Sequence, residues 1–298
     1  MRLSGILPPL PTPFDADGNL DLGLLRALVE HLNGTGLSGY LALGSNGEAV
    51  HLTPAEAPAV VRAVREAAAP GMTVLAGTGQ LSTAATLDAT ARAAAAGADA
   101  VLVFPPFYYR GLMTGDALRR HFETVASASP VPVVLYNVPV NTGLTLPVEV
   151  AAALSRHQNV LGIKDSAGDV GQLAELVRTT RGGRPFDVLA GSFAATLPGL
   201  AIGASGAILA VANVAPRECV AILDLVRQGR PEEAREVHMR ILPVARLVTS
   251  RFGVPGLKAA LALLGHPAGL PRLPLLPLPE EHRPEVGSTL REAGLLPA

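Results

Sequence analysis

A short apolar run ends in three polar residues at Val160-Leu161-Gly162-Ile163-Lys164-Asp165-Ser166. Runs that are apolar throughout, instead of alternating, are typical of strands buried on both faces of a parallel sheet. Similar runs recur along the chain, and stretches with helical periodicity separate them. We expect eight strands, at Ile6–Pro11, Tyr40–Leu43, Thr73–Ala76, Ala100–Phe104, Val131–Tyr136, Val160–Ile163, Asp187–Ala190 and Ser205–Leu209.

Helix starts are marked between these runs. Thr53-Pro54-Ala55-Glu56 combines an N-cap, a first-turn proline and a capping-box glutamate. Three more helices are expected to be capped by Asp21, Ser82 and Thr114. Eight strands, each followed by a helix, predict an α/β fold of the (β/α)8 TIM barrel type. A doubly wound open sheet is the alternative, but it does not need eight units, and no GxGxxG motif follows the first strand.

The chain continues beyond the eighth unit with further helical stretches. They cover Pro231–Ser250, Pro255–Leu264 and Pro279–Ala293, and a proline-rich connector separates the last two. We therefore expect a barrel over residues 1–229 and a helical C-terminal extension over residues 230–298 that packs on the barrel.

Composition restricts the partners and the compartment. The chain has 298 residues, of which 49% are apolar, and a net charge of −1, which gives no reason to expect nucleic acid or an anionic membrane as a partner. The single cysteine, Cys219, rules out an internal disulfide and is compatible with a reducing cytoplasm. The N-terminus has no signal-like apolar segment, and Ser205 and Asn213 interrupt the apolar stretch from Gly199 to Ala215. We expect a soluble cytoplasmic protein.

Lysine is almost absent, because the chain has two lysines against twenty-two arginines. Arginine serves surface charge equally well, but it cannot lose its proton at neutral pH and attack a carbonyl. A lysine at the end of an apolar strand is desolvated, which favours the neutral, nucleophilic amine. We therefore expect Lys164 to form a Schiff base, whereas Lys258, in a helix-like stretch, has no comparable setting.

Polar side chains follow several of the expected strands. In a (β/α)8 barrel the carboxyl ends of the strands meet at one mouth, where the chemistry takes place. Lys164 and Tyr136 end neighbouring strands, so the phenol can pass protons during imine formation and carbon–carbon cleavage. The residues expected at this mouth are Thr12, Ser45, Asn46, Thr78, Tyr136, Asn137, Lys164, Asp165, Ser166, Gly191 and Ser192.

Other kinds of site find less support in the sequence. Gly44-Ser45-Asn46-Gly47-Glu48 lets backbone amides approach a substrate carboxylate, although a plain tight turn is the alternative. Glu48 is expected to order this loop. None of the seven histidines ends a strand, which argues against a metal-dependent aldolase, and no G-x-S-x-G motif indicates a serine hydrolase. Cys219 is expected to be packed in a helix and unreactive.

Four motifs together resemble the dihydrodipicolinate synthase/N-acetylneuraminate lyase family over essentially the whole chain. They are Gly44–Glu48, Tyr136-Asn137-Val138-Pro139, Gly162–Ser166 and Gly203–Asn213. The resemblance implies a class I aldolase on a TIM barrel that uses pyruvate, a small oxo acid, through a covalent lysine imine and without a metal or other cofactor. It also implies a homotetramer, arranged as a dimer of dimers.

The same resemblance assigns roles to individual residues. Lys164 would form the imine, Tyr136 would relay protons and Ser45 would be its hydroxyl partner. The amides of Ser45 and Asn46 would hold the pyruvate carboxylate, with the Ile208 backbone nearby. Tyr108 matches a family tyrosine that reaches into a neighbouring subunit's site, although Tyr109 is adjacent.

Two departures concern the substrate. Asn141 occupies the place where the synthases carry an arginine for the carboxylate of aspartate semialdehyde, and Ser45-Asn46 replaces their threonine pair. Both departures resemble the 4-hydroxy-2-oxoglutarate aldolases of the family, which predicts cleavage of that substrate to pyruvate and glyoxylate. The substrate-binding residues would include Asn141, Ser166 and Gly191, and Arg110 is a candidate cation for the distal carboxylate.

Three alternatives stay open at this point. The first is 4-hydroxy-tetrahydrodipicolinate synthesis from pyruvate and aspartate semialdehyde. The second is cleavage of a 2-keto-3-deoxy sugar acid. The third is a barrel that binds an oxo acid as a sensor or scaffold without turnover.

Overall fold

The computed structural model describes residues 2–297, and all eight strands in that range belong to one sheet. The strands follow one another in the order β1-β8-β7-β6-β5-β4-β3-β2. Their bounds are β1 Gly5–Leu7, β2 Gly39–Ala42, β3 Thr73–Gly77, β4 Ala100–Val103, β5 Val133–Asn137, β6 Val160–Asp165, β7 Asp187–Ala190 and β8 Gly206–Ile208. Each lies at one of the eight expected positions, within two residues at either end, except that β1 ends at Leu7, four residues before the expected end at Pro11.

The sheet is parallel, and its two end strands are connected. Every pair from β3 to β8 is parallel. Just after β1, Pro9 forms a parallel bridge with Leu41 of β2, and Leu41 donates its N–H to the Pro8 carbonyl at 3.0 Å. This bridge links the two ends of the strand order. The predicted (β/α)8 TIM barrel is therefore confirmed, and the doubly wound open sheet is excluded.

The described helices are α1 Leu22–Leu32, α2 Ala57–Ala67, α3 Thr83–Ala95, α4 Gly115–Ala128, α5 Pro139–Thr142, α6 Val148–Leu154, α7 Val170–Thr180, α8 Thr196–Ala201, α9 Pro216–Arg227, α10 Pro231–Arg246, α11 Gly253–Leu263 and α12 Arg283–Glu292. Short 3₁₀ turns cover η1 Ser45–Gly47, η2 Ala49–His51, η3 Arg110–Leu112, η4 Ala210–Asn213 and η6 Glu280–His282, and η5 Leu247–Arg251 is a π-helical turn.

The expected helix caps are correct at three positions and wrong at one. The side chains of Asp21, Ser82 and Thr114 each accept a backbone N–H at the start of α1, α3 and α4. Thr53 does not cap α2, which begins four residues later at Ala57. The Glu56 carboxylate accepts from the Thr53 N–H at 2.8 Å, so this motif closes a turn before the helix.

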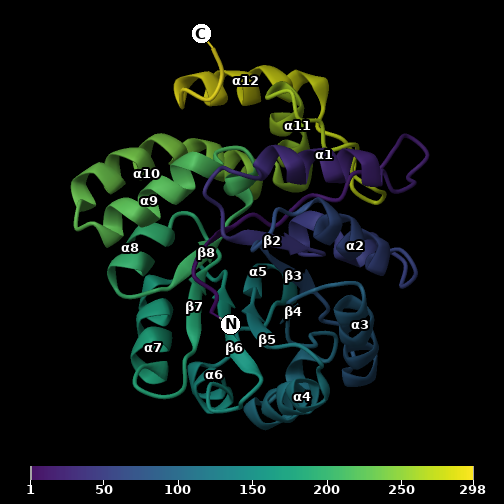
Figure 1. The fold of residues 1–298 in the computed structure, drawn as a ribbon, viewed down its shortest axis with the longest axis vertical. Coiled ribbons are helices and arrows are strands. Elements are labelled where there is room, and N and C mark those ends of the chain that lie inside the picture. Colours follow the sequence, from purple (N-terminus) through teal and green to yellow (C-terminus); the bar gives the residue numbers. More distant parts are fainter. Residues whose placement is uncertain (1, 298) are drawn as a thin grey trace. The chain divides into compact units, whose positions relative to one another are not determined.

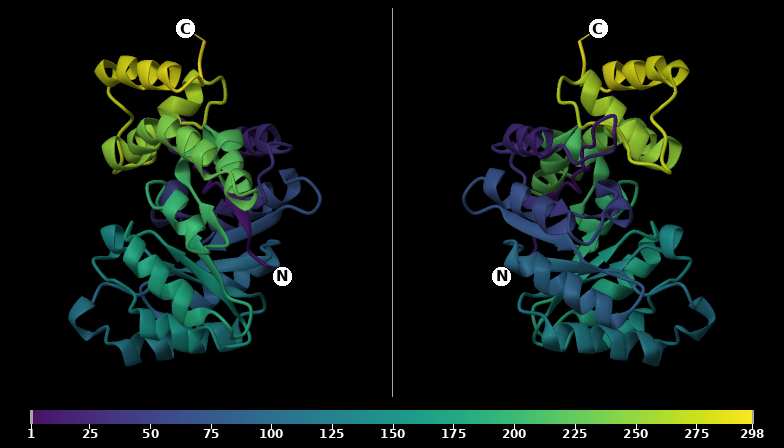
Figure 2. Two further views of the ribbon diagram at one scale, coloured as in Figure 1. Left: turned by 90° about the vertical axis from the view of Figure 1, so that its left-hand side faces the viewer. Right: turned by 90° about the vertical axis from the view of Figure 1, so that its right-hand side faces the viewer.

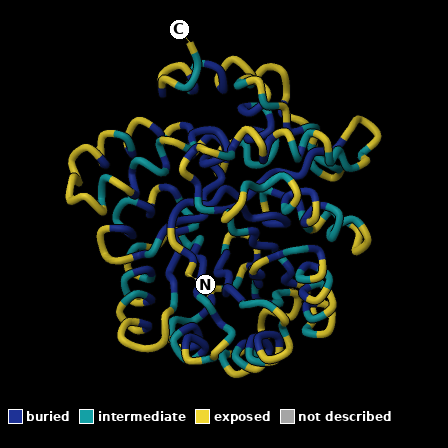
Figure 3. Tube along the Cα trace, viewed as in Figure 1, coloured by how far each residue is buried: buried dark blue, intermediate teal, exposed yellow. Residues whose placement is uncertain are grey.

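The chain forms two compact units, of which the first contains Leu75–Ile208 and the N-terminal residues up to Gly5. Within it, α3, α4, α6 and α7 lie outside the strands (Figure 1). The strands are buried and the outer helix faces are exposed (Figure 3). At the start of β7 the buried Asp187 carboxylate accepts from the Arg2 guanidinium, the Leu3 N–H at 2.7 Å and the Ser205 hydroxyl at 2.9 Å.

The second unit contains Ile6–Val74 and the chain from Leu209 onward. In it α9 packs against α10, and α11 packs against α12 (Figure 2). The helical stretches expected after the eighth unit are present as α10, α11 and α12. The boundary expected between residues 229 and 230 stays a prediction. Within residues 2–297, no helix combines the length and the apolar character that crossing a bilayer requires.

Candidate active site

Lys164 and Tyr136 are direct neighbours at the carboxyl ends of β6 and β5. The two residues pair in register across the strands, and both side chains are buried, with 4% and 6% of their surface exposed. The Lys164 Nζ lies 4.4 Å from the centre of the Tyr136 ring. The structure thus brings together the amine and the phenol that the sequence singled out. Their chemical roles stay predictions.

A buried hydrogen-bond network fixes the strand ends that carry these two side chains. The Asn137 amide donates to the Asp165 carboxylate at 2.7 Å, and Gln172 of α7 donates to the same oxygen at 2.8 Å. Asn137 also accepts the Leu146 N–H at 2.8 Å, which ties down the loop after α5. Burial raises the pKa of Asp165, although the hydrogen bonds from Asn137, Ala167 and Gln172 oppose this shift. Alternation along a strand sends Asp165 to the opposite face from Lys164.

Ser166 and Gly191 meet at the ends of β6 and β7. Gly191 donates its N–H to the Asp165 carbonyl at 2.6 Å. A Cβ atom at position 191 would overlap the Ser166 hydroxyl oxygen and lie 3.0 Å from the Asp165 carbonyl oxygen. The absence of a side chain at Gly191 therefore lets the Ser166 hydroxyl take its position, which brings together two of the expected substrate-binding residues.

Arg110 lies against the short helix that carries Asn141. Gly143 ends α5 in the left-handed conformation with φ +63°, and a Cβ there would meet Arg110 Nη1 at 2.5 Å and Cζ at 3.5 Å. The Asn141 N–H donates to the Val138 carbonyl at 3.0 Å within the same turn. A guanidinium thus lies beside this segment, although position 141 itself carries an amide.

Tyr108 and Tyr109 lie on the surface of the same unit. Their rings contact each other edge to face, with centroids 5.1 Å apart. Tyr108 is 71% exposed and Tyr109 is 66% exposed, and the surface also carries Leu112 and Val140, at 70% and 84%. The register between Tyr108 and Tyr109 stays open. Ile208, expected near the substrate, ends β8 and is buried.

Ser45 and Asn46 belong to the second unit, where they begin the 3₁₀ turn η1 after β2. Ser45 is exposed and Asn46 is half-buried. The Thr12 hydroxyl donates to the Gly47 carbonyl at 2.6 Å, which joins this loop to the segment after β1. Glu48 ends the turn in the left-handed conformation with φ 52°. The binding roles of Ser45 and Asn46 stay predictions.

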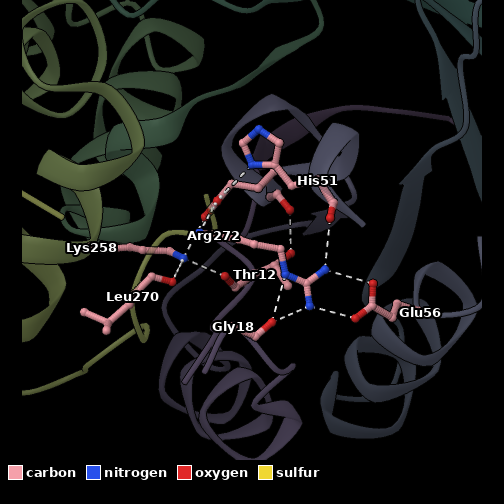
Figure 4. Close-up of polar contacts among 9 residues, drawn as sticks. Thr12, Gly18, His51, Glu56, Lys258, Leu270 and Arg272 are labelled. Carbon is pink, nitrogen blue, oxygen red and sulfur yellow. Dashed lines mark hydrogen bonds and ion pairs between the residues drawn. The ribbon is translucent and has the colours of Figure 1, made fainter. Parts of the chain in front are cut away.

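Lys258 lies in a buried site, contrary to the expectation from the sequence. Its side chain on α11 is 4% exposed, and its ammonium donates to the Glu48 carboxylate at 2.7 Å (Figure 4). Burial lowers the pKa of Lys258, while the hydrogen bond and charge of Glu48 oppose the shift. Glu48 thus orders its loop through a distant partner. The rarity of lysine in the chain was the sequence signal that could have pointed to Lys258. The helical periodicity around Lys258 gives no indication that its side chain is buried.

Two other expectations concern cysteine and metals. Cys219 is fully buried on α9, and burial raises the pKa of its thiol, as expected for a packed residue. Within residues 2–297, no three His, Cys, Asp or Glu side chains gather closely enough to hold a metal ion. The expectation of a metal-free reaction stays a prediction.

Comparison with known proteins identifies relatives over nearly the whole chain. The model of the dihydrodipicolinate synthetase family matches residues 2–293. A 4-hydroxy-tetrahydrodipicolinate synthase of Methanothrix thermoacetophila is 39% identical over 286 residues, which are 96% of this chain and 95% of the relative.

Solved structures agree with these relatives. The pyruvate complex of YagE, a prophage protein of E. coli K12 from the dihydrodipicolinic acid synthase family, is 33% identical with a TM-score of 0.93 and 99% coverage of both chains. The pyruvate complex of the Acinetobacter baumannii dihydrodipicolinate synthase is 30% identical, also with a TM-score of 0.93, and covers 98% of this chain and 99% of that one.

Proposed function

The chain belongs to the dihydrodipicolinate synthetase family of pyruvate-dependent class I aldolases, and we propose that Lys164 is the residue that forms the imine with pyruvate. The observation that carries this proposal is the buried Lys164 amine, 4.4 Å from the Tyr136 ring at the ends of two neighbouring strands. Because the chain is a lyase of this family, a sensor or scaffold without turnover is set aside.

In the proposed chemistry the Lys164 amine first forms an imine with the substrate and is set free again in the last step. The Lys164 nitrogen attacks the C2 carbonyl of the oxo acid, and water leaves to give a protonated imine. In the synthetic direction the imine loses a C3 proton and becomes an enamine, whose C3 attacks an aldehyde. In the cleavage direction the imine accepts the electron pair of the breaking C3–C4 bond, and the aldehyde departs. In cleavage Tyr136 takes the C4-hydroxyl proton as the C3–C4 bond breaks and then returns a proton to C3 of the enamine. In synthesis it takes the C3 proton and gives a proton to the aldehyde oxygen. Water then adds to the resulting imine and releases the product from Lys164.

The acceptor aldehyde is proposed to carry a carboxylate of its own. Arg110 lies against Gly143, beside the segment in which the synthases carry their arginine and this chain carries Asn141. A guanidinium can bind a carboxylate through two parallel hydrogen bonds. Both aspartate semialdehyde and glyoxylate have such a group, so Arg110 is compatible with either.

We take 4-hydroxy-tetrahydrodipicolinate synthesis as the first candidate, because it is the activity in the names of relatives 33–40% identical to this chain. Cleavage of 4-hydroxy-2-oxoglutarate is the second candidate, and Asn141 together with Ser45-Asn46 favours it. A 2-keto-3-deoxy sugar acid lacks a comparable observation in its favour.

The homotetramer is also part of the proposal. Tyr108, Tyr109, Leu112 and Val140 are large apolar side chains that are exposed in this unit, and exposed apolar side chains suit contact with a second copy of the chain. In such an assembly Tyr108 would supply its phenol to the partner's site, as the family resemblance implies. Sedimentation of purified protein over a range of concentrations tests the assembly.

The experiment that separates the candidates compares two reactions on one preparation. We expect a higher kcat/KM for condensation of pyruvate with aspartate semialdehyde than for pyruvate release from 4-hydroxy-2-oxoglutarate. The opposite ranking would transfer the assignment to the aldolase. Failure of both reactions, with no pyruvate adduct, would refute the proposed function. Arg110→Ala should raise KM for the aldehyde roughly tenfold or more with little change for pyruvate, whereas Arg120→Ala, on the exposed face of α4, should change neither.

A further inference from the structure

Both lysines of this arginine-rich chain are buried, and only one of them has a role in the proposed reaction. The second, Lys258, donates to three oxygen atoms: the Thr12 carbonyl at 2.7 Å, Glu48 Oε1 at 2.7 Å and the Leu270 carbonyl at 2.6 Å (Figure 4). An ammonium has three N–H groups, so this site uses all of them. A planar guanidinium has five donors in a fixed fork and does not match three converging oxygen atoms. This geometry explains why position 258 carries a lysine and not an arginine.

Glu48 is the charged partner, and it has an unusual backbone conformation. Its φ of 52° is in the left-handed region, which costs free energy for a residue with a side chain. Glu48 is 2% exposed, and its carboxylate accepts from Lys258 through Oε1. Its Oε2 accepts from the Arg272 N–H at 2.8 Å and lies 3.3 Å from His51 Nδ1. The ion pair with Lys258 therefore helps to hold Glu48 in this conformation.

The conformation of Glu48 is transmitted to the residues just before it. The Glu48 N–H donates to the Ser45 carbonyl at 3.2 Å, and the Gly47 N–H donates to the Gly44 carbonyl at 3.0 Å. A change at Glu48 would therefore change the turn that presents Ser45 and Asn46. Thr12 holds the same loop from the other side, because its hydroxyl binds Gly47 and its carbonyl binds Lys258.

Arg272 fastens the C-terminal segment around this loop. Its guanidinium donates to the Gly18 carbonyl, to the His51 carbonyl at 2.9 Å and to both oxygens of Glu56 (Figure 4). The Phe14 ring packs against both cations, with Arg272 Cζ at 4.2 Å and Lys258 Nζ at 5.0 Å from its centre. Residues from α11 onward thus contact the loop after β2 at several points.

We propose that Lys258 is a positioning residue for pyruvate binding: its ion pair with Glu48 holds Gly44–Glu48 in the conformation in which Ser45 and Asn46 receive the pyruvate carboxylate. The inference rests on the proposed function, since that function gives Ser45 and Asn46 their role. A loop that is already ordered in the free protein binds pyruvate more tightly, because binding then carries no further cost in conformational entropy. Loss of the pair should therefore weaken pyruvate binding more than it slows the chemistry at Lys164.

The test removes both charges together. Lys258→Met alone would leave a carboxylate buried without its cation, which can prevent folding. The double variant Lys258→Met/Glu48→Gln keeps the side-chain volumes and leaves no lone charge. Borohydride inactivation as a function of pyruvate concentration gives a half-saturating concentration and a maximal rate. We expect the first to rise at least tenfold and the second to stay within about threefold of the wild-type value.

The matched control is a second buried carboxylate far from this loop in the sequence. Asp187→Asn removes the charge that binds Arg2 at the start of β7. This variant should melt at a lower temperature than the wild type, as the double variant should, but leave half-saturation by pyruvate unchanged. If the two variants lose comparable thermal stability and neither changes half-saturation, the Lys258–Glu48 pair only stabilises the fold and the inference is wrong.

A second readout does not depend on the proposed function. Hydrogen exchange of a peptide spanning residues 44–48 in the free protein should be faster in the double variant and unchanged in Asp187→Asn. If wild-type protein forms no pyruvate adduct, the proposed function fails, and exchange alone decides whether the pair holds the loop. Unchanged exchange in the folded double variant would overturn the inference whatever the pyruvate result.

Discussion

Lys164 and Tyr136 pair across β6 and β5, with the lysine nitrogen 4.4 Å from the centre of the phenol ring. Strand register fixes this relationship, so it does not depend on a flexible loop. The Asn137–Asp165 hydrogen bond lies one residue further along the same two strands and locks their ends together. Rigid strands therefore hold the amine and the phenol side by side, which supports the imine chemistry that we propose for them.

Tyr136→Phe tests the proton-relay role. We expect kcat to fall by on the order of a hundred- to ten-thousand-fold, because the substitution removes the hydroxyl and keeps the ring beside Lys164. Steady-state kinetics and the rate of borohydride trapping give the two measurements. Trapping should be slower but still reach completion, since the amine is present. A variant with wild-type kcat would exclude Tyr136 from proton transfer.

Gly191→Ala tests the close approach of β7 to Ser166. The added methyl group would overlap the Ser166 hydroxyl, so we expect a loss of about 1–3 kcal/mol in stability and a lower kcat/KM. Gly183→Ala is the control, because a Cβ there has only the Thr180 carbonyl nearby, at 3.9 Å. Thermal melts and kinetics of both variants provide the comparison. Equal behaviour of the two variants would contradict the described packing.

His121 predicts a pH dependence of stability. Burial lowers its pKa from 6.5 to about 4, and its ring bonds Thr83 through Nδ1 at 2.9 Å. At position 121 the unfolded chain therefore binds a proton more readily than the folded chain. The free energy of unfolding is highest above about pH 6.5, and it decreases as the pH falls towards 4, by up to about 3 kcal/mol.

His121→Leu should remove most of this dependence. Urea unfolding at about pH 7 and about pH 5 should give midpoints that differ clearly in the wild type and less in the variant. An equal drop in both proteins would assign the effect to other groups.

The barrel could be predicted from the sequence because its signals are local. Strand runs such as Val160–Ile163 are apolar throughout since both faces are buried, and caps such as Ser82 act within one helical turn. The helix cap predicted at Thr53 is wrong because the residue pattern of a capping box can also close a turn.

The setting of Lys258 could not be predicted in this way. Its partners Thr12 and Glu48 are 246 and 210 residues away in the chain, and helical periodicity carries no information about them. The position of Arg110 could not be predicted from the sequence for a similar reason, because its contact with Gly143 depends on the packing of two loops. Pairs that form through tertiary packing need the structure.

The central claim is that Lys164 forms the imine, and borohydride trapping of pyruvate on the purified protein tests it most directly. Peptide mass spectrometry should locate the reduced adduct on Lys164 in the wild type. Lys164→Arg should show no adduct while it keeps the wild-type circular dichroism spectrum, because arginine holds the charge but supplies no nucleophilic amine. An adduct on Lys258, or trapping that persists in Lys164→Arg, would contradict the account.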